Sequence, residues 1–529
     1  MLRKKPTSTL VLALAALAAG PLASALLAQE PAAAPRPSPR TIIRQAPAES
    51  CRLLDSKEAV GRMDGLYFNL AWSCGREAEL AKRYVPALEK QGDPDFATIE
   101  AVDVQVNNSA GETGTSTTQS ETSIAYNPNT GTYCSSFNDS WEFFGSTGGG
   151  GFTGFSRSTT GGVSWNDRGA VGGNSFGDPS VVWRQVDANF YLATLDAGGG
   201  LAVWRSTDDC QTFTQISTPS TGSDDKELLA VDNNPASPNY GNLYLVWTDF
   251  GVAGTPIRGS RSVDGGLTWS AATNISAAGL VQGAWPAVAP NGDVFVAWLR
   301  YASFPSGNIT VEVARSTNGG LTYAAVTSPL VNAVSPRQSA ATNSCGRPAL
   351  KGNIRYLASP QITVDSAGTL HVVYSRDPNA FNNGDVVNVY YKRSTNSGST
   401  WSAEFKLNDV NAEDQFFPTI QSNGTTIVTA WYDRRNHAQN VRVDYFKRTS
   451  NDGGLTWGPN VRITDVNSPI RLDPNLATCY HGDYDQSVVT ADGAVIQWAD
   501  DRNLVGTRND PDVWTDVQTP AAPPPPDER

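Results

Sequence analysis

Short runs in which apolar and polar residues alternate follow one another along most of this chain. Residues 228–231, 243–247 and 257–262 are a representative group of three such runs, separated by polar stretches. An alternation with a period of two predicts a β-strand with one buried face, because successive side chains of a strand point to opposite sides. The pattern therefore predicts an all-β protein made of many short strands.

A polar eight-residue motif, which we call the box, follows these groups of runs and occurs six times. Its pattern is Ser-x-Asp/Asn-x-Gly-x-Thr-aromatic, clearest in SVDGGLTW at residues 262–269 and SNDGGLTW at residues 450–457. Asp or Asn can accept hydrogen bonds from the backbone just ahead, Gly can adopt a positive φ, and the aromatic ring can pack beneath the turn. The box therefore predicts a hairpin turn between two strands. Variant copies occupy residues 158–165 (Thr160 for Asp), 206–213 (Cys210 for Gly), 316–323 (Asn318) and 394–401 (Asn396).

Three alternating runs precede each box and a fourth follows it, so that one unit contains four short strands. A four-stranded unit that recurs about every 40–50 residues is the signature of a β-propeller blade. A seventh unit without a box occupies residues 485–489, 494–498 and 513–517 and supplies three strands. We expect the alternating segment 97–106 to complete that last blade and close the ring. The sequence thus predicts seven blades, with six blades and a C-terminal appendage as the alternative.

The segments on either side of the predicted propeller differ from it in composition. Residues 1–25 have the basic start, apolar stretch and small-residue cleavage site of a signal peptide, and no later stretch is apolar enough to span a membrane. Residues 26–40 are a Pro/Ala linker, and residues 519–529 are a Pro-rich tail that we expect to be disordered. Residues 41–95 carry Leu80, Tyr84 and Leu88 at helical spacing, which predicts a small helical cap. The sequence therefore predicts a secreted or periplasmic protein whose propeller spans residues 96–518.

Strand direction sorts the loops of a propeller onto two faces. Because antiparallel strands alternate in direction, the boxes lie on one face, and the loops after second strands lie on the other with the connections between blades. We call this second face the top face. It is predicted to carry carboxylates, arginines and aromatic residues, which suit the hydrogen bonding and ring stacking of sugars. Its members include Glu121, Asp139, Asp178, Asp249, Trp285, Arg300, Arg376, Asp433, Arg434, Asp483, Tyr484 and Asp500.

Six cysteines in an exported chain indicate disulfides, although their number alone allows many pairings. A bridge on the top face would hold an insertion at residues 331–355 beside the predicted pocket. The pairs that position favours are Cys51–Cys74 before the repeats, Cys134–Cys210 on the box face and Cys345–Cys479 on the top face. The sequence leaves other partners open for the last four cysteines.

The formal net charge of −12 argues against a nucleic-acid partner, because proteins that bind phosphate backbones need a basic surface. The three histidines are scattered and the cysteines are expected to be oxidised, so no zinc site is expected. No cofactor is expected, although Asp178, Asp483 and Asp485, with loop carbonyls, are candidate ligands for Ca²⁺. Capping of strand or helix ends is the alternative role of these three residues.

The six boxes resemble the Asp boxes, or bacterial neuraminidase repeats, of the sialidase superfamily, and the resemblance covers residues 120–517. It implies the propeller fold. It implies little about chemistry, because the box is a structural turn on the face opposite the pocket. Proteins with such boxes include sialidases, other glycosidases, polysaccharide lyases and propellers without known catalysis.

Sialidases bind the substrate carboxylate with three arginines and use a Tyr nucleophile assisted by Glu, with an Asp as acid/base. The resemblance implies Arg300, Arg376 and Arg434 as the candidate carboxylate clamp, since bidentate binding by arginine depends on geometry and not on sequence order. It implies Tyr484 as the candidate nucleophile, activated by Asp483 or Glu121. The family's first arginine motif is missing, because residues 119–124 read QSETSI. The remaining candidates are Asp139 as a catalytic carboxylate, and Asp249, Asp433, Asp500 and Trp285 in substrate binding.

Two functions fit these observations. The first is a secreted carbohydrate-active enzyme, an exo-glycosidase that works with the carboxylates and arginines of the top face. The second is a non-catalytic propeller that binds glycan or protein partners at the same pocket, which the missing arginine motif favours. In the second case the Asp–Arg pairs at strand ends bridge neighbouring blades, and Tyr484 only packs the ring. The expected partner is a glycan or polysaccharide, and the sequence does not indicate an oligomeric state.

Overall fold

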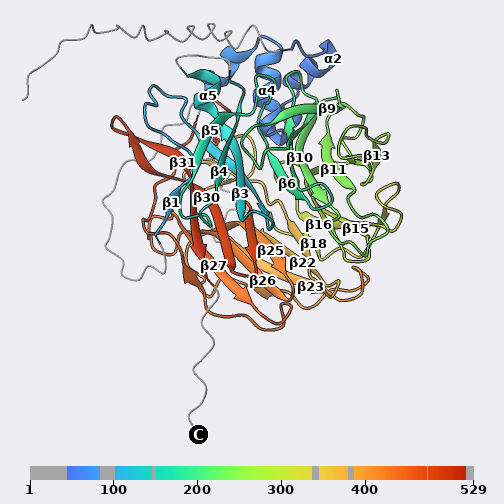
Figure 1. Ribbon diagram of the computed structural model, residues 1–529. Coiled ribbons are helices and arrows are strands. Elements are labelled where there is room, and N and C mark those ends of the chain that lie inside the picture. The colour runs from blue at the N-terminus through green and yellow to red at the C-terminus, as the bar shows by residue number, and fades with distance from the viewer. Residues whose placement is uncertain are drawn as a thin grey trace, which may run out of the picture. The chain divides into compact units, whose positions relative to one another are not determined.

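Seven antiparallel sheets follow one another along the chain and form the blades of a propeller (Figure 1). A computed structural model describes residues 44–83, 102–145, 150–335, 345–378, 387–473 and 475–519. The first strands of neighbouring blades contact one another around the ring, including those of the first and last blades. The predicted seven-bladed β-propeller is therefore confirmed, and the six-bladed alternative is wrong. The predicted signal peptide and linker, Tyr84 and Leu88, and the tail beyond Thr519 lie outside the described residues.

Six blades use consecutive strands in sequence order. The first is β2 (Gln119–Asn127), β3 (Thr132–Asp139), β4 (Thr153–Ser158) and β5 (Asn166–Ala170). The second is β6 (Ser180–Arg184), β7 (Asn189–Leu195), β8 (Leu201–Ser206) and β9 (Thr214–Ser220). The third is β10 (Asp224–Val231), β11 (Leu243–Asp249), β12 (Ile257–Ser262) and β13 (Thr273–Asn274). The fourth is β14 (Leu280–Val288), β15 (Val294–Tyr301), β16 (Ile309–Ser316) and β17 (Ala324–Ala325), with β18 (Leu330–Ala333) also paired to β16.

The fifth blade is β21 (Gln361–Val364), β22 (Leu370–Arg376), β23 (Asn388–Ser394) and β24 (Phe405–Lys406). The sixth is β25 (Gln415–Asn423), β26 (Thr426–Asp433), β27 (Asp444–Ser450) and β28 (Val461–Arg462). Before the fifth blade, β19 (Ala349–Leu350) and β20 (Ile354–Arg355) form a small hairpin. The second strands carry much of the core, because Trp247 of β11, Trp431 of β26 and Trp498 of β30 (Gly493–Val505) are fully buried.

The N-terminal side of the chain closes the last blade. Its strands are β29 (Ser487–Thr490), β30, β31 (Arg508–Gln518) and, outermost, β1 (Val104–Gln105). Val104 pairs with Thr515 and Gln105 with Trp514, in antiparallel register. The predicted closure is confirmed for these two residues. It ties both ends of the repeat array together and covers the edge of β31.

Each box joins the third strand of a blade to the fourth, and its side chains hold the turn. In the third blade, Ser262 Oγ accepts a hydrogen bond from Gly266 N at 2.8 Å and donates one to Asp264 Oδ1 at 2.8 Å. Asp264 also accepts hydrogen bonds from the backbone N and the hydroxyl of Thr268. Gly266 has a φ of 79°, which a residue with a side chain rarely adopts. Trp269 Nε1 donates to Gly266 O at 3.1 Å, so the ring lies beneath the turn as predicted.

Replacing Asp264 with Ala is expected to lower the free energy of unfolding by about 1 kcal/mol, because the turn loses the hydrogen bonds from Ser262 and Thr268. Urea titration followed by fluorescence measures this change. The matched control is Thr160→Ala in the first box, where a smaller loss is expected because Thr160 stands in place of the carboxylate. An equal loss in both variants would contradict this account of the box.

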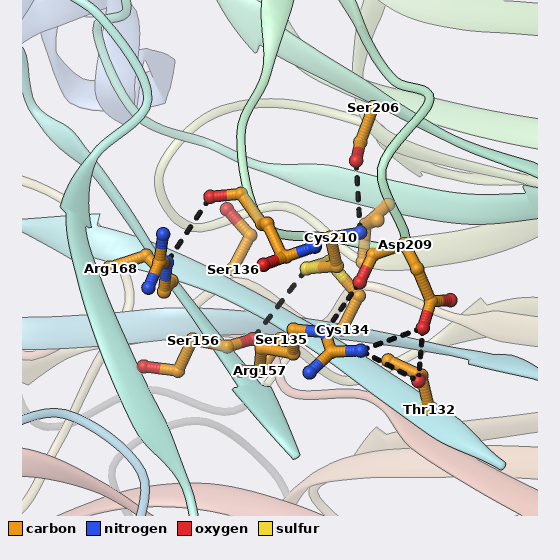
Figure 2. Close-up of a disulfide and its surroundings, with 12 residues drawn as sticks. Thr132, Cys134, Ser135, Ser136, Ser156, Arg157, Arg168, Ser206, Asp209 and Cys210 are labelled. Atoms are coloured by element: carbon orange, nitrogen blue, oxygen red, sulfur yellow. Dashed lines mark hydrogen bonds and ion pairs between the residues drawn. A yellow bond between two sulfur atoms is a disulfide. The ribbon is translucent and has the colours of Figure 1, made fainter. Parts of the chain in front are cut away.

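The three disulfides are Cys51–Cys74, Cys134–Cys210 and Cys345–Cys479, which confirms the favoured pairings. Figure 2 shows the Cys134–Cys210 bridge, and beside it Arg157, whose guanidinium donates hydrogen bonds to both Asp209 and Thr132. Cys210 replaces Gly in its box but keeps the left-handed backbone, with a φ of 65°. Its backbone N donates to Ser206 Oγ at 2.9 Å, as Gly266 N does to Ser262 in the third box. The disulfide therefore joins a box to the second strand of the neighbouring blade.

Short helices precede the propeller, which confirms a helical N-terminal segment. Asn69 of α4 (Gly65–Ser73) donates a hydrogen bond to Asp196 O beside β7, and Leu66 N of α4 donates one to Asp225 of β10, so this helix lies on the top face. Leu80 lies in a 3₁₀ helix and not in a regular α-helix. No helix in the described part of the chain is long and apolar enough to cross a membrane. The helices are α2 (Ala48–Cys51), η1 (Arg52–Asp55), α3 (Lys57–Arg62), α4 (Gly65–Ser73), η2 (Glu77–Arg83) and, after β3, α5 (Ser140–Phe144).

Candidate functional site

The first strands of several blades carry a β-bulge at the end that lies on the top face. The register shifts between Ser120 and Ser123 in β2, and between Asp225 and Leu228 in β10. Each bulge contains one residue in the left-handed region, Glu121 with a φ of 53° and Lys226 with a φ of 56°. A side chain in this backbone conformation is strained, and a bulge redirects it out of the regular alternation. The bulges bring Glu121 of the first blade and Lys226 of the third within 3.3 Å of each other.

Lys226 is the centre of a buried group of charges drawn from several parts of the chain. Its Nζ lies 3.3 Å from Glu121 Oε1 and 3.8 Å from Asp64 Oδ2, and it also forms a close ion pair with Asp483. These residues come from the third blade, the first blade, the N-terminal helices and the connection before the seventh blade. The Lys226 side chain is only 4% exposed, and the three carboxylates are fully buried.

Two arginines from the insertion before the fifth blade complete this group. Arg355 lies 3.0 Å from Glu121 Oε1, 3.3 Å from Asp483 Oδ2 and 3.3 Å from Asp64 Oδ1. Arg347 Nη1 lies 2.7 Å from Asp64 Oδ1. The insertion is held in place by the Cys345–Cys479 disulfide and by a hydrogen bond from Arg355 N to Cys479 O at 3.0 Å. We call Asp64, Glu121, Lys226, Arg347, Arg355 and Asp483 the ion cluster.

Aromatic rings flank the ion cluster. Arg355 lies over the ring of Tyr480 at 4.4 Å from its centroid, and Lys226 lies over the ring of Tyr484 at 4.5 Å. Asn138 Nδ2 donates to the Tyr480 hydroxyl at 2.8 Å and to Glu121 Oε2 at 2.9 Å, and so links these two groups. The Tyr484 hydroxyl donates to Pro179 O at 3.5 Å. Cation–π contact of this kind fixes the orientation of both cations.

Burial and the neighbouring charges set the protonation of the carboxyl groups. Burial raises the pKa of both Glu121 and Asp483 to about 7, although Lys226 and Arg355 oppose this rise. Burial also acts to raise the pKa of Asp64, but Arg347, Arg355 and Lys226 outweigh it and hold that pKa well below its usual range. Asp64 is therefore ionised at neutral pH, while Glu121 and Asp483 can exchange protons there. Groups that titrate near the working pH are suited to general acid and base chemistry.

Four of the residues singled out in the sequence lie in or beside the ion cluster. Glu121 and Asp483 belong to it, and Tyr484 stacks on Lys226. Trp285 meets the ring of Tyr484 edge-on, with 6.3 Å between centroids. Their catalytic and binding roles stay predictions.

The other predicted site residues form separate pairs within their own blades. Asp139 accepts a hydrogen bond from Glu142 N and so caps α5. The three arginines expected to converge on one carboxylate are each held by a different one, and none belongs to the ion cluster. These pairs are Arg300–Glu312, Arg376–Glu404, Arg434–Asp414, Asp249–Arg258, Asp433–Arg435 and Asp500–Arg502.

Sequence reasoning missed Asp64, Lys226, Arg347 and Arg355. Arg347 and Arg355 could have been found from their position, because both lie in the insertion that contains Cys345. That insertion was already expected to lie beside the pocket. Lys226 stands within the run Asp224-Asp225-Lys226-Glu227 at the start of a first strand. A lysine inside an acidic run that enters a strand suggests a buried ion pair.

Two of the three Ca²⁺ candidates, Asp483 and Asp485, have partners of other kinds. Asp483 faces Lys226 and Arg355, and Asp485 accepts hydrogen bonds from Thr122 and Tyr432. Within the described ranges, no group of three or more His, Cys, Asp or Glu side chains is arranged to hold a metal ion.

Two kinds of cavity lie near the propeller axis. Beside the ion cluster, two cavities of about 10 Å³ each have room for little more than a water molecule. A larger cavity of about 440 Å³ lies toward the box face and is lined by the first strands, with Tyr126, Val182 and Val488 among its walls. No charged side chain lines this larger cavity. The charged groups of the ion cluster therefore lie apart from this larger cavity.

Comparisons with known proteins add a sequence relative and several similar folds. No protein-family model matches the chain. It is 23% identical over 159 residues to a sialidase from Clostridium perfringens, a match that covers 27% of this chain and 41% of that protein. The chain thus matches less than half the length of this relative. The predicted resemblance to sialidase-like β-propellers is confirmed by this match together with the seven blades.

Among solved structures, the chain is similar to an ulvan lyase, a polysaccharide lyase, with a TM-score of 0.44, 9% identity and coverage of 77% of this chain and 94% of that one. It is also similar to an intramolecular trans-sialidase from leech, with a TM-score of 0.40, 12% identity and coverage of 63% and 67%. An intramolecular trans-sialidase from Ruminococcus gnavus gives a TM-score of 0.40, 12% identity and coverage of 63% and 93%.

Proposed function

We propose that this protein binds an acidic carbohydrate at the ion cluster and cleaves a glycosidic bond there. The observation that carries the proposal is that Arg347, Arg355 and Lys226 together hold one carboxylate, that of Asp64. Three converging cations that hold one carboxylate have the chemistry needed to hold the carboxylate of a sugar acid. The sialidase relative, whose name refers to an enzyme that acts on such sugars, supports the same substrate class.

Glu121 is the residue that we propose as the proton-transferring group. Its pKa of about 7, raised by burial, suits exchange of a proton at neutral pH. Asn138 links it to the Tyr480 hydroxyl, and Arg355 contacts both the Glu121 carboxylate and the Tyr480 ring. Tyr480 therefore joins Tyr484 as a candidate nucleophile. Asp483, between Lys226 and Arg355, orients these two cations.

One observation favours binding without catalysis. The hydroxyl of Tyr484 points to a backbone carbonyl, that of Pro179, and burial raises the pKa of Tyr484 well above its usual value. A tyrosine that stays protonated is a poor nucleophile unless a base takes its proton. Binding of an acidic glycan without turnover would select this second function.

The test compares acidic oligosaccharides with the same compounds after reduction of their carboxylates. Sialyllactose and a galacturonate tetramer are suitable probes, with calorimetry for binding and release of reducing sugar for turnover. Only the acidic forms are expected to bind, and Arg355→Gln is expected to weaken binding about 30- to 100-fold through loss of charge-assisted hydrogen bonds. Arg300→Gln is the control, because Arg300 is paired with Glu312 outside the ion cluster. Equal binding of acidic and reduced glycans would contradict the proposal.

We infer further that the protein works outside the cytoplasm. Three disulfides support this, because such bonds form and persist in oxidising compartments. The signal peptide expected from residues 1–25 is consistent with export.

A further inference from the structure

We propose that residues 44–83 are a plug that closes the ion cluster, with the Asp64 carboxylate in the place that the ligand's carboxylate takes after the plug leaves. This inference rests on the proposed function. The plug adds a control step to the proposed function, because a sugar acid can enter only when the N-terminal helices move away from the top face. Four independent features of the described residues support it.

The first feature is the orientation of Asp64. It stands at the N-cap of α4, where an Asp side chain normally accepts a hydrogen bond from the first turn of its own helix. Here the side chain makes no capping hydrogen bond. Its carboxylate turns away to Arg347 at 2.7 Å, Arg355 at 3.3 Å and Lys226 at 3.8 Å. The Asp64 carboxylate therefore contacts the cations of the ion cluster and does not cap its own helix.

The second feature is that the propeller supplies the missing cap. Asp225 Oδ2 accepts a hydrogen bond from Asp64 N at 2.9 Å, and Asp225 Oδ1 accepts one from Leu66 N at 2.9 Å. Gln282 Nε2 donates to Asp225 Oδ2 at 2.6 Å and to Arg62 O at 3.0 Å. Side chains of the third and fourth blades thus bind the backbone on both sides of Asp64.

The third feature is the closeness of the approach at Gly65. A Cβ atom at this position would lie 2.3 Å from Asp178 Oδ1 and 2.8 Å from Asp178 Oδ2, which is too close for a real contact. Asp178 is itself fully buried. Only a residue without a side chain lets the first turn of α4 reach this depth. With the plug in place, the cavities beside the ion cluster measure only about 10 Å³ each, far below the volume of a sugar ring.

The fourth feature is that none of the three disulfides joins the plug to the propeller. The plug's disulfide, Cys51–Cys74, joins two residues of the plug, and the other two disulfides join residues of the propeller. Away from the ion cluster, Phe68 packs on Phe143 and Phe176, and Asn69 Nδ2 donates to Asp196 O at 2.8 Å. These contacts are non-covalent, so the plug can leave without breaking a disulfide.

Displacement of the plug removes one carboxylate that Lys226, Arg347 and Arg355 all contact. A ligand carboxylate can then take its place among the same three cations. The apparent affinity equals the intrinsic affinity multiplied by the fraction of molecules in the open state. Any change that increases this open fraction should therefore raise the apparent affinity by the same factor.

The experiment uses the full chain and two substitutions that act on the plug in different ways. Gly65→Ala inserts a methyl group against Asp178, and Asp64→Asn removes the charge that the cations hold. Glu49→Gln is the matched control, because Glu49 is an exposed carboxylate of the same segment. Sialyllactose and a galacturonate tetramer are titrated against each protein, and hydrogen exchange of the α4 amides reports opening without any ligand.

Both Gly65→Ala and Asp64→Asn are expected to bind the acidic glycan at least about 10-fold more tightly than the wild type, with faster exchange in α4. Addition of glycan to the wild type should also speed α4 exchange, while Glu49→Gln behaves as the wild type. Tight binding to the wild type with α4 still protected would overturn the plug and leave the proposed function standing. Binding to none of the proteins, despite faster α4 exchange in the variants, would overturn the proposed function and the plug's regulatory role with it.

A protease site placed between Arg83 and Val102 is a second route to the same result, should both substitutions prevent folding. Cleavage leaves β1, which begins at Val104, on the propeller side of the cut. Release of the 44–83 fragment by acidic glycan, and not by the carboxyl-reduced glycan, supports the plug. Retention of the fragment at saturating glycan contradicts it.

Discussion

Lys226→Met is expected to lower the free energy of unfolding at pH 8 by about 3–5 kcal/mol, the usual cost of breaking a buried ion pair by removing one partner. The Lys226 side chain is 4% exposed and faces Asp64, Glu121 and Asp483, all fully buried. Methionine fills a similar volume but leaves these carboxylates with less positive charge. Urea unfolding at several pH values measures the effect.

The loss should shrink as the pH falls. The pKa values of Glu121 and Asp483 are already about 7 through burial, and removal of Lys226, which opposes that rise, moves them higher. At pH 5 both groups then carry protons and no longer need a cation. Lys57→Met is the matched control, since Lys57 is exposed on α3, and it should leave the unfolding midpoint unchanged. A cost for Lys226→Met that is the same at pH 5 and pH 8 would contradict this account of the ion cluster.

The wild-type protein is expected to become more stable as the pH is lowered from 8 to 5. Burial raises the pKa of several carboxyl groups to about 7, among them Glu121, Asp225, Asp483 and Asp485. In the unfolded chain such groups titrate near pH 4. Between about pH 4 and pH 7 the folded state therefore binds more protons than the unfolded state, so stability falls as the pH rises through this window. The gain from pH 8 to pH 5 should be on the order of 3 kcal/mol or more, at about 1.4 kcal/mol for each unit of pKa shift in one group.

Below about pH 4 the direction reverses. The pKa of Asp64 is depressed by its three cations, so its stabilising contribution is present above the unfolded pKa and is lost as the pH falls through the folded value. Denaturant titrations at pH 3, 5, 6.5 and 8 should therefore show a maximum near pH 5. Glu121→Gln should flatten the slope between pH 5 and pH 7, because it removes one of the groups that take up a proton. A wild-type stability that rises steadily from pH 5 to pH 8 would be incompatible with the raised pKa values.

The architecture could be predicted from the amino-acid sequence alone, because the features that build a blade are local. The box holds its own turn through contacts within eight residues, from Ser262 to Trp269, and strand alternation is also a short-range pattern. Repetition of these patterns predicted seven blades and closure by the N-terminal strand. Strand direction then placed Cys134 and Cys210 on one face and Cys345 and Cys479 on the other, where both pairs are bonded.

The sequence predicted which residues lie on the top face, but it did not predict how far each of them lies from the propeller axis. The first strands line the axis, whereas the second strands lie one strand further out, roughly 5 Å away. Arg300 and Arg376 lie near or at the ends of second strands, Arg434 follows one, and all three meet carboxylates of their own blades. Glu121 and Lys226 stand in bulges of first strands and reach the ion cluster.

The composition of the ion cluster, including its contacts with Asp64, depends on the tertiary structure. Lys226 and Asp483 are 257 residues apart in the sequence, and Arg355 and Glu121 are 234 apart. Nothing in the local pattern of either partner indicates the other, because the pairing exists only once the ring has closed and the insertion is bonded to Cys479. Asp64 lies in a short segment outside the repeats, at the N-cap of α4. Its burial among three cations follows from the shape of the top face, and this shape cannot be predicted from short-range patterns in the sequence.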